Sequence, residues 1–165
     1  KIFKKFENIQ KIFVGRCFGI ETNDKRIIDD KNNNIVCYVS VKQNKDRKRY
    51  INLKVNNEMK FWKVISPTAV KGAYSGFDKL FILNEDEVHS GSYVSFKVET
   101  EFQANSLKSY LQTKIVNKLL SIRKVSQTIS KDTCKYIPLV PFDRNWTDEK
   151  IYEYLKLSQE QIHIL

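Results

Sequence analysis

The sequence predicts an α+β fold in which a mixed or antiparallel β-sheet region is followed by helices. Short β-branched and aromatic runs dominate residues 35–99, whereas apolar residues recur at helical spacing from residue 102 to residue 122. Two further helix starts follow, each marked by a capping residue. A chain of 165 residues is long enough for one core and short for two, so we expect a single domain over residues 1–165.

The start of the chain is expected to form a helix that leads into a loop. Residues 1–14 place four apolar side chains at spacings of three and four, which predicts an amphipathic helix. These side chains are Phe3, Phe6, Ile9 and Phe13. Residues 20–34 are polar and rich in Asn and Asp, a composition typical of a loop.

Five short runs rich in Val, Ile and aromatic residues are expected to form strands. Charged, glycine-containing or acidic stretches separate them. The expected strands are residues 35–41, 50–55, 60–67, 79–83 and 92–99. In the last one, Tyr93, Ser95 and Lys97 alternate with apolar residues, so we expect one buried and one solvated face. We expect His89, shortly before this strand, in a turn.

The hydrophobic period changes after residue 99, which predicts one long helix. Thr100 and Gln103 fit a capping box, and apolar residues then recur at helical spacing for about twenty residues. These apolar residues are Phe102, Leu107, Leu111, Ile115, Leu119 and Ile122. Residues 123–133 are expected to form a loop or a second helix.

An extended segment and two short helices are expected at the C-terminal end. Prolines keep residues 135–142 out of the helical region. Thr147 is a favourable N-cap for one helix, and Ser158 with Gln161 fits a capping box for the next. We expect Trp146, like Trp62 in the strand region, to anchor the core.

The chain carries a large positive charge, which favours a polyanionic partner. It has 29 Lys and Arg against 19 Asp and Glu, a net charge of +10 and a pI near 9.4. Such a surplus points to nucleic acid first and to an anionic membrane second. No apolar run reaches the length of a membrane span. Three cysteines without C-x-x-C spacing are expected to be reduced thiols, which indicates a cytoplasmic protein.

Catalytic and metal-binding signatures are sparse. The sequence has no Gly-rich phosphate loop, no S-adenosylmethionine motif and no [DN]-P-P-[YFW]. One nuclease-like group remains, in which Asp46 precedes Glu58 and Lys60, because metal-dependent nucleases place such residues around a divalent ion. A small metal-dependent nuclease is therefore one alternative function. A basic, non-enzymatic interaction module is another.

Three groups of residues and Arg16 are candidates for DNA contacts. The connector at 42–49 offers Lys45 and Arg47, and the loop at 68–77 offers Lys71 and Tyr74. Lys and Arg suit phosphates and guanine, Gln suits adenine, and Tyr can stack on a base. The third group lies along the expected long helix and its exit, and comprises Lys114, Arg123, Lys124, Gln127, Thr128 and Lys131.

Several motifs in the second half of the chain carry a family resemblance. They correspond to Y-L-x-T-K-F, R-K-x-x-Q, F-V-P-x-x-D-F and W-T-D-E-x-L-Y-x-x-Y-x-L-x-x-E-E-I. The matching positions are Tyr110, Leu111, Thr113, Lys114, Arg123, Lys124, Gln127, Ile137, Pro138, Phe142, Trp146 to Glu149, Tyr152, Tyr154, Leu157, Glu160 and Ile162. "GRCFGIETN" and "FWKVISPTAVKGAYSG" match more loosely. The chain thereby resembles the C-terminal end of bacterial adenine-specific DNA methyltransferases of restriction–modification systems.

The resemblance implies that this chain is the target-recognition domain of such an enzyme, either a Type II methyltransferase or a fused endonuclease–methyltransferase. It implies sequence-specific binding of double-stranded DNA, with base readout from residues 66–76 and 112–131. A catalytic domain before Lys1 in the same polypeptide would bind S-adenosylmethionine and methylate a flipped adenine. This fragment alone is then expected to hold no cofactor, metal or catalytic residue.

Overall fold

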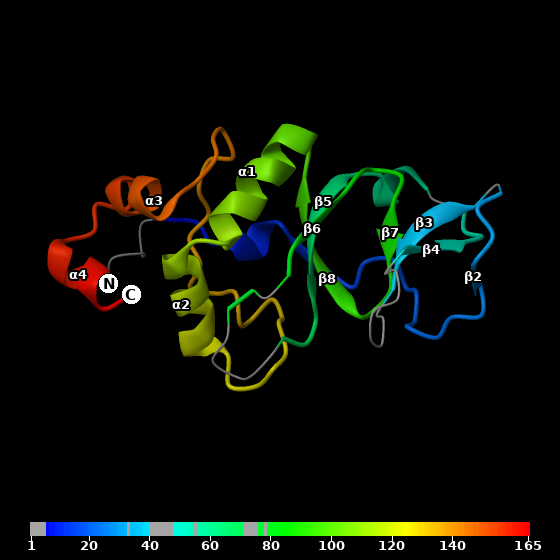
Figure 1. Ribbon diagram of the computed structural model, residues 1–165, viewed down its shortest axis with the longest axis horizontal. Helices are drawn as coiled ribbons and strands as arrows, with labels where there is room; N and C mark the ends of the chain where they lie inside the picture. The colour runs from blue at the N-terminus through cyan, green and yellow to red at the C-terminus, as the bar shows by residue number, and fades with distance from the viewer. Residues whose placement is uncertain (1–5, 33, 40–47, 55, 71–75, 78) are drawn as a thin grey trace.

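The computed structural model describes residues 6–32, 34–39, 48–54, 56–70, 76–77 and 79–165. Within these residues the chain forms two sheets and a set of helices, so the predicted α+β fold class is confirmed (Figure 1). Sheet one is antiparallel and contains β1 (Phe13–Gly15), β8 (Tyr93–Val98), β5 (Trp62–Pro67) and β6 (Phe81–Leu83), in this spatial order.

Sheet two is smaller and mixed. In spatial order its strands are β2 (Ile27–Ile28), β4 (Lys48–Ile51), β3 (Ile35–Tyr38) and β7 (Val88–His89). Strands β3 and β4 pair in an antiparallel arrangement, whereas β3 and β7 are parallel. The helices are η2 (Ile9–Lys11), η3 (Asn57–Met59), α1 (Glu101–Leu111), α2 (Lys114–Arg123), α3 (Asp148–Tyr154) and α4 (Gln159–His163). No helix of the described residues is long and apolar enough to span a membrane.

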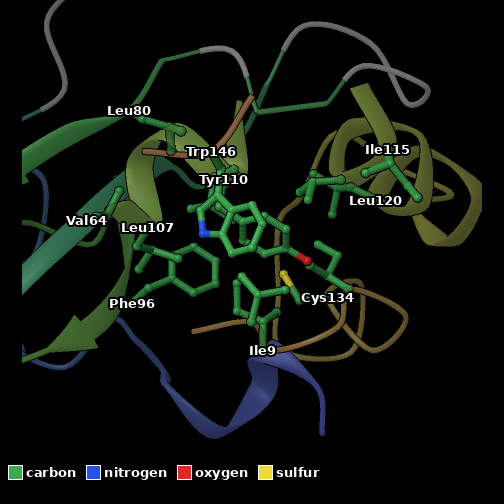
Figure 2. Packing of buried hydrophobic residues seen from close by; sticks show 14 of the residues in the cluster. Ile9, Val64, Leu80, Phe96, Leu107, Tyr110, Ile115, Leu120, Cys134 and Trp146 are labelled. Atoms are coloured by element: carbon green, nitrogen blue, oxygen red, sulfur yellow. The ribbon is translucent and has the colours of Figure 1, made fainter. Parts of the chain in front are cut away.

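Sheet one is the middle layer of the molecule. Figure 1 shows α1, α2, α3 and α4 on one side of it and sheet two on the other. The main core lies on the helical side, where α1 packs on β5 and β6, and where α1 and α2 share one apolar cluster with residues of β5 and β8. Figure 2 shows this core, with Trp146 and Tyr110 among side chains from sheet one and both helices.

The central strands β5 and β8 are buried on both faces. Val64 and Phe96 face the helices, whereas Ile65 and Tyr93 pack with residues of sheet two. The alternation in β8 therefore does not mark a solvated face, because Ser95 is fully buried and only Lys97 of this strand is exposed. That expectation was wrong because sheet two covers the face that the polar residues occupy.

Two ionisable side chains lie between the sheets. Lys63 is fully buried, and its ammonium group donates to the carbonyls of Asn84 and Glu87 at 2.7 Å each. Burial lowers the pKa of Lys63 to about 8. His89 is 1% exposed, with Nε2 3.0 Å from Ser95 Oγ, and burial lowers its pKa to about 4. His89 belongs to strand β7, so the expectation that it lies in a turn was wrong.

The predicted helix over residues 1–14 is absent from the described part of that range. The backbone from residue 7 pairs with the expected extended segment, since Ile9 N donates to Ile137 O at 2.9 Å and Leu139 N to Glu7 O at 2.7 Å. The chain then forms the short turn η2 and enters β1. The apolar spacing of three and four residues was misleading here because residues 7–9 pair with residues 137–139, and a local sequence pattern does not show so distant a partner.

The predicted helical region is present, but it is divided into α1 and α2. Thr100 Oγ1 accepts from Gln103 N at 3.2 Å and begins α1. The break follows Leu111, and Asp148 Oδ1 accepts the amide of Lys114 at 2.7 Å to start α2. Because α2 takes a new direction, Ile122 is 65% exposed instead of buried.

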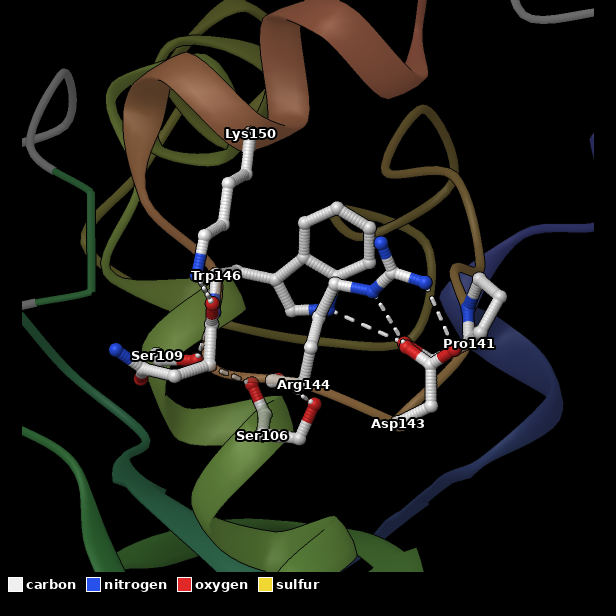
Figure 3. Close-up of polar contacts among 8 residues, drawn as sticks. Ser106, Ser109, Pro141, Asp143, Arg144, Trp146 and Lys150 are labelled. Carbon is white, nitrogen blue, oxygen red and sulfur yellow. Dashed lines mark hydrogen bonds and ion pairs between the residues drawn. The ribbon is translucent and has the colours of Figure 1, made fainter.

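The C-terminal segment packs as predicted, and Trp146 anchors it. Its indole donates to Pro141 O at 3.1 Å, and its amide donates to Ser109 Oγ at 2.9 Å (Figure 3). Trp146 is 3% exposed, and Trp62 packs partly buried against the same core. The expected N-cap Thr147 begins α3, and the capping box of Ser158 begins α4.

We expect His89→Gln to flatten the pH dependence of stability between pH 6.5 and about 4. In this window the unfolded chain binds more protons than the folded one, because burial beside the Lys63 ammonium lowers the pKa of His89. The free energy of unfolding of the wild type should therefore decrease as the pH is lowered through this window. His89 accounts for up to about 3 kcal/mol of this decrease. Chemical denaturation across this range measures the difference, and parallel pH profiles for the two proteins would contradict it.

Candidate nucleic-acid interface

Two segments that the sequence marked separately for base readout lie side by side. Ala69 and Thr128 form an antiparallel bridge. Val70 N donates to Gln127 O at 3.0 Å, and Ile129 N donates to Thr68 O at 2.7 Å. We call residues 68–70 together with 123–131 the loop edge. It joins the end of β5 to the exit of α2 in one short two-stranded ribbon.

The loop edge presents an exposed tip between two buried anchors. Lys124 and Ile129 are each 1% exposed, whereas all four residues 125–128 are exposed. The Lys124 amide donates to Leu120 O at 3.0 Å, so the anchor is continuous with the last turn of α2. Thr128 N donates to Ser126 Oγ at 3.3 Å within the tip. The tip is therefore fixed at both ends.

Asn117 fixes a second segment against α2. Its Oδ1 accepts from Phe77 N at 2.6 Å, and its Nδ2 donates to Leu111 O and Thr113 O at 3.2 and 2.8 Å. Gly76 approaches so closely that a Cβ there would lie 1.8 Å from Asn117 Oδ1. Gly76 and Phe77 are thereby held beside the helix that leads to the loop edge.

The stretch from residue 112 through α2 to the loop edge is strongly basic in sequence. Residues 112–131 contain no Asp or Glu, and their five cationic residues equal half of the net charge of +10: Lys114, Lys118, Arg123, Lys124 and Lys131. Lys118 and Lys131 are exposed. Arg123 pairs with Asp132 at 2.7 Å, and its Nε is buried without a partner in the described part of the chain.

The structure separates the other predicted contacts. Arg16 is exposed beside Gly91. The Gly91 carbonyl accepts from Thr68 Oγ1 at 3.2 Å, and Thr68 belongs to the loop edge, so Arg16 lies next to the loop edge. Lys114 is exposed but lies at the opposite end of α2, near Asp148. Gln127, Thr128 and Lys131 all belong to the loop edge.

The expectation that Lys124 lies on an exposed face was wrong. Helix α2 ends at Arg123, and Lys124 takes an extended conformation with φ −81° and ψ 108°. This turn directs the side chain inward, where burial lowers its pKa. Lys124 is therefore a buried anchor of the loop edge.

Several predicted contacts lie outside the described residues. These are Lys45, Arg47, Lys71 and Tyr74, together with Asp46 of the nuclease-like group. Glu58 is exposed in η3, and Lys60 pairs with Asp86 at 3.3 Å. No cluster of His, Cys, Asp and Glu that could hold a metal ion occurs among the described residues.

The buried thiols are poor nucleophiles. Burial raises the pKa of both Cys37 and Cys134 to about 12, so their thiolates are scarce at neutral pH. A groove of about 180 Å³ lies between α2 and α4, and it is lined mainly by aliphatic side chains. The loop edge therefore remains the described region in which the predicted contacts gather.

Comparison with protein-family models, curated proteins and solved structures gives no match to this chain. Sequence reasoning missed Asn117 and the inward turn of Lys124. No local signal marks either, since the partner of Asn117 lies 40 residues away. The exposed Val125 was also missed, although its place between polar residues in "RKVSQT" offered a signal.

We expect Asn117→Ala to destabilise the protein by about 1–3 kcal/mol, because it leaves the Phe77 amide without its acceptor. Hydrogen exchange at the Phe77 amide should accelerate as well. Asn105→Ala is a matched control on α1, since within the described residues the Asn105 side chain donates to Glu101 O of its own helix. Equal exchange rates at Phe77 in wild type and Asn117→Ala would refute the role assigned to Asn117.

Proposed function

We propose that this chain is the DNA target-recognition domain of a restriction–modification adenine methyltransferase. The observation that carries the proposal is the loop edge. Residues 68–70 and 127–129, which come from the two segments expected to read bases, pair there beside a helix rich in cations. The sequence resemblance supports the proposal that this interface belongs to a larger methyltransferase. Methyl transfer and S-adenosylmethionine binding then belong to a catalytic domain of the same polypeptide in the bacterial cytoplasm.

The chemistry of the loop edge suits double-stranded DNA. Exposed Lys131 of the loop edge and exposed Lys118, which lies on α2 beside the groove to α4, supply phosphate contacts, which give affinity and orientation without sequence preference. Gln127 and Thr128 offer hydrogen-bonding groups of the kind that contact base edges. Arg16 lies near enough to add a contact at the flank of the ribbon.

The isolated chain is expected to bind duplex DNA with a steep salt dependence and to methylate nothing. Lys118→Ala combined with Lys131→Ala should reduce the slope of log K against log salt by about 2, because each lost phosphate contact removes about one unit. Fluorescence anisotropy with a labelled duplex across a salt series measures the slope. The double variant Lys108→Ala and Lys150→Ala removes the same charge from α1 and α3 and should keep the wild-type slope.

The outcomes separate this proposal from its alternatives. A shallow or absent salt dependence favours a non-enzymatic interaction module with another partner. Magnesium-dependent cleavage of the duplex that Glu58→Ala abolishes favours the nuclease. Methyl transfer by the isolated chain would overturn the assignment of catalysis to another domain.

Asp132→Asn is expected to tighten DNA binding severalfold at low salt. The wild-type carboxylate pairs with Arg123 at 2.7 Å and is 67% exposed, so it both occupies the guanidinium and repels phosphates. The substitution keeps the size of the side chain and removes its charge. Asp143→Asn, at an exposed pair with Arg144 away from the loop edge, is the matched control. Weaker binding by Asp132→Asn in the same anisotropy assay would contradict this role.

A further inference from the structure

We propose that the tip of the loop edge recognises an A·T base pair in the major groove, with Gln127 bonding to adenine and Val125 contacting the thymine methyl group. This inference rests on the proposed function and specifies what the interface selects. It assigns a contact to Val125, which is not among the polar and aromatic residues expected to bind DNA.

The exposure of Val125 is the first observation that carries this inference. Its side chain is 90% exposed, the highest value among the exposed large hydrophobic residues of the described chain. The others are less exposed, from Tyr154 at 36% to Ile164 at 70%. Leaving an aliphatic group in water forgoes the free energy of its burial. A partner that covers Val125 recovers that free energy.

The polar and charged neighbours of Val125 indicate the chemistry of that partner. Gln127 is exposed two residues further along the same tip, and Lys118 and Lys131 are exposed on either side in the sequence. An apolar protein surface would leave these cations and this amide without partners. A DNA groove satisfies all three kinds of group, because it offers phosphates, base-edge hydrogen-bonding groups and thymine methyl groups.

The anchors of the tip make this contact specific. Lys124 and Ile129 are buried at its two ends, and the backbone of Gln127 is bonded to Val70. The two ends of the stretch that carries Val125 and Gln127 are therefore held before binding, so less conformational entropy is lost on contact. Val125 and Gln127 are two residues apart in this stretch, a spacing that suits neighbouring groups of one base pair or base step.

Adenine and thymine are the bases that these two side chains match. A glutamine amide can bond to N6 and N7 of adenine together, with one donor and one acceptor. The thymine C5 methyl group is the apolar feature of the major groove, and valine offers two methyl groups to it. Guanine instead presents two acceptors on this edge, which suit the guanidinium of Arg123 better than an amide.

The test uses two base analogues in a duplex pool with a randomised centre. Sequences that the wild-type chain selects should share an A·T pair, and two further versions of the best duplex are then prepared. In one, deoxyuridine replaces thymidine, which removes only the methyl group. In the other, 7-deazaadenine replaces adenine, which removes the N7 acceptor. Each replacement at the selected pair should weaken wild-type binding, the loss of N7 by about fivefold to a hundredfold.

The variants link each analogue to one side chain. Val125→Ala should bind the thymidine and deoxyuridine duplexes equally, while it still distinguishes 7-deazaadenine from adenine. Gln127→Ala should show the opposite pattern. Ile164→Ala and Gln159→Ala change exposed residues of the same types near and in α4, and they should respond to both analogues as the wild type does.

The results distinguish failure of this inference from failure of the proposed function. A wild-type chain that shows no salt-dependent duplex binding overturns both. Selective binding without an A·T pair, or with equal affinity for the analogue duplexes, overturns only the inference. Variants that respond to the analogues exactly as the wild type does overturn the assignment to Val125 and Gln127. If Val125→Ala changes no DNA contact but disrupts an association with a protein, the tip is a protein-docking site instead.

Discussion

The burial of β5 and β8 on both faces is the constraint on which the rest of the structure depends. One face requires α1 and α2, and the other requires sheet two, so neither cover can be lost without exposing apolar strand residues such as Val64 or Ile65. The cover from sheet two also encloses Lys63 and His89, whose polar atoms are paired with backbone carbonyls or Ser95. Burial of these groups is stable only because each finds such partners.

Local sequence signals predicted the elements whose causes are local. The caps at Thr100, Thr147 and Ser158 are such cases, as are the β-branched runs that form β3, β5 and β8. The failures arose where a distant segment decides the outcome. Residues 7–9 pair with residues 137–139 instead of forming a helix, and the carboxylate of Asp148 starts α2 after a break that helical periodicity does not show.

The candidate interface divides in the same way. Its composition was visible in the sequence, because Gln127, Thr128 and the basic residues near them are consecutive or nearly so. Its geometry was not, since the bridge from Ala69 to Thr128 joins positions far apart in the chain. Lys124 shows the physical reason most clearly. A basic residue at a helix exit is commonly solvated, but here the backbone leaves the helix at that position and turns the side chain inward.

The cap that Asp148 provides for α2 has a consequence for the order in which the protein folds during synthesis. Helix α2 and the loop edge are translated well before residue 148, yet the amide of Lys114 finds its acceptor only there. The amide of Ile9 likewise finds its acceptor only when Ile137 has been synthesised. The nascent chain can thus assemble its strands on the ribosome, but its main core closes only when the C-terminal segment emerges. A nascent chain that ends before Trp146 would leave the core residues against which this side chain packs without their cover.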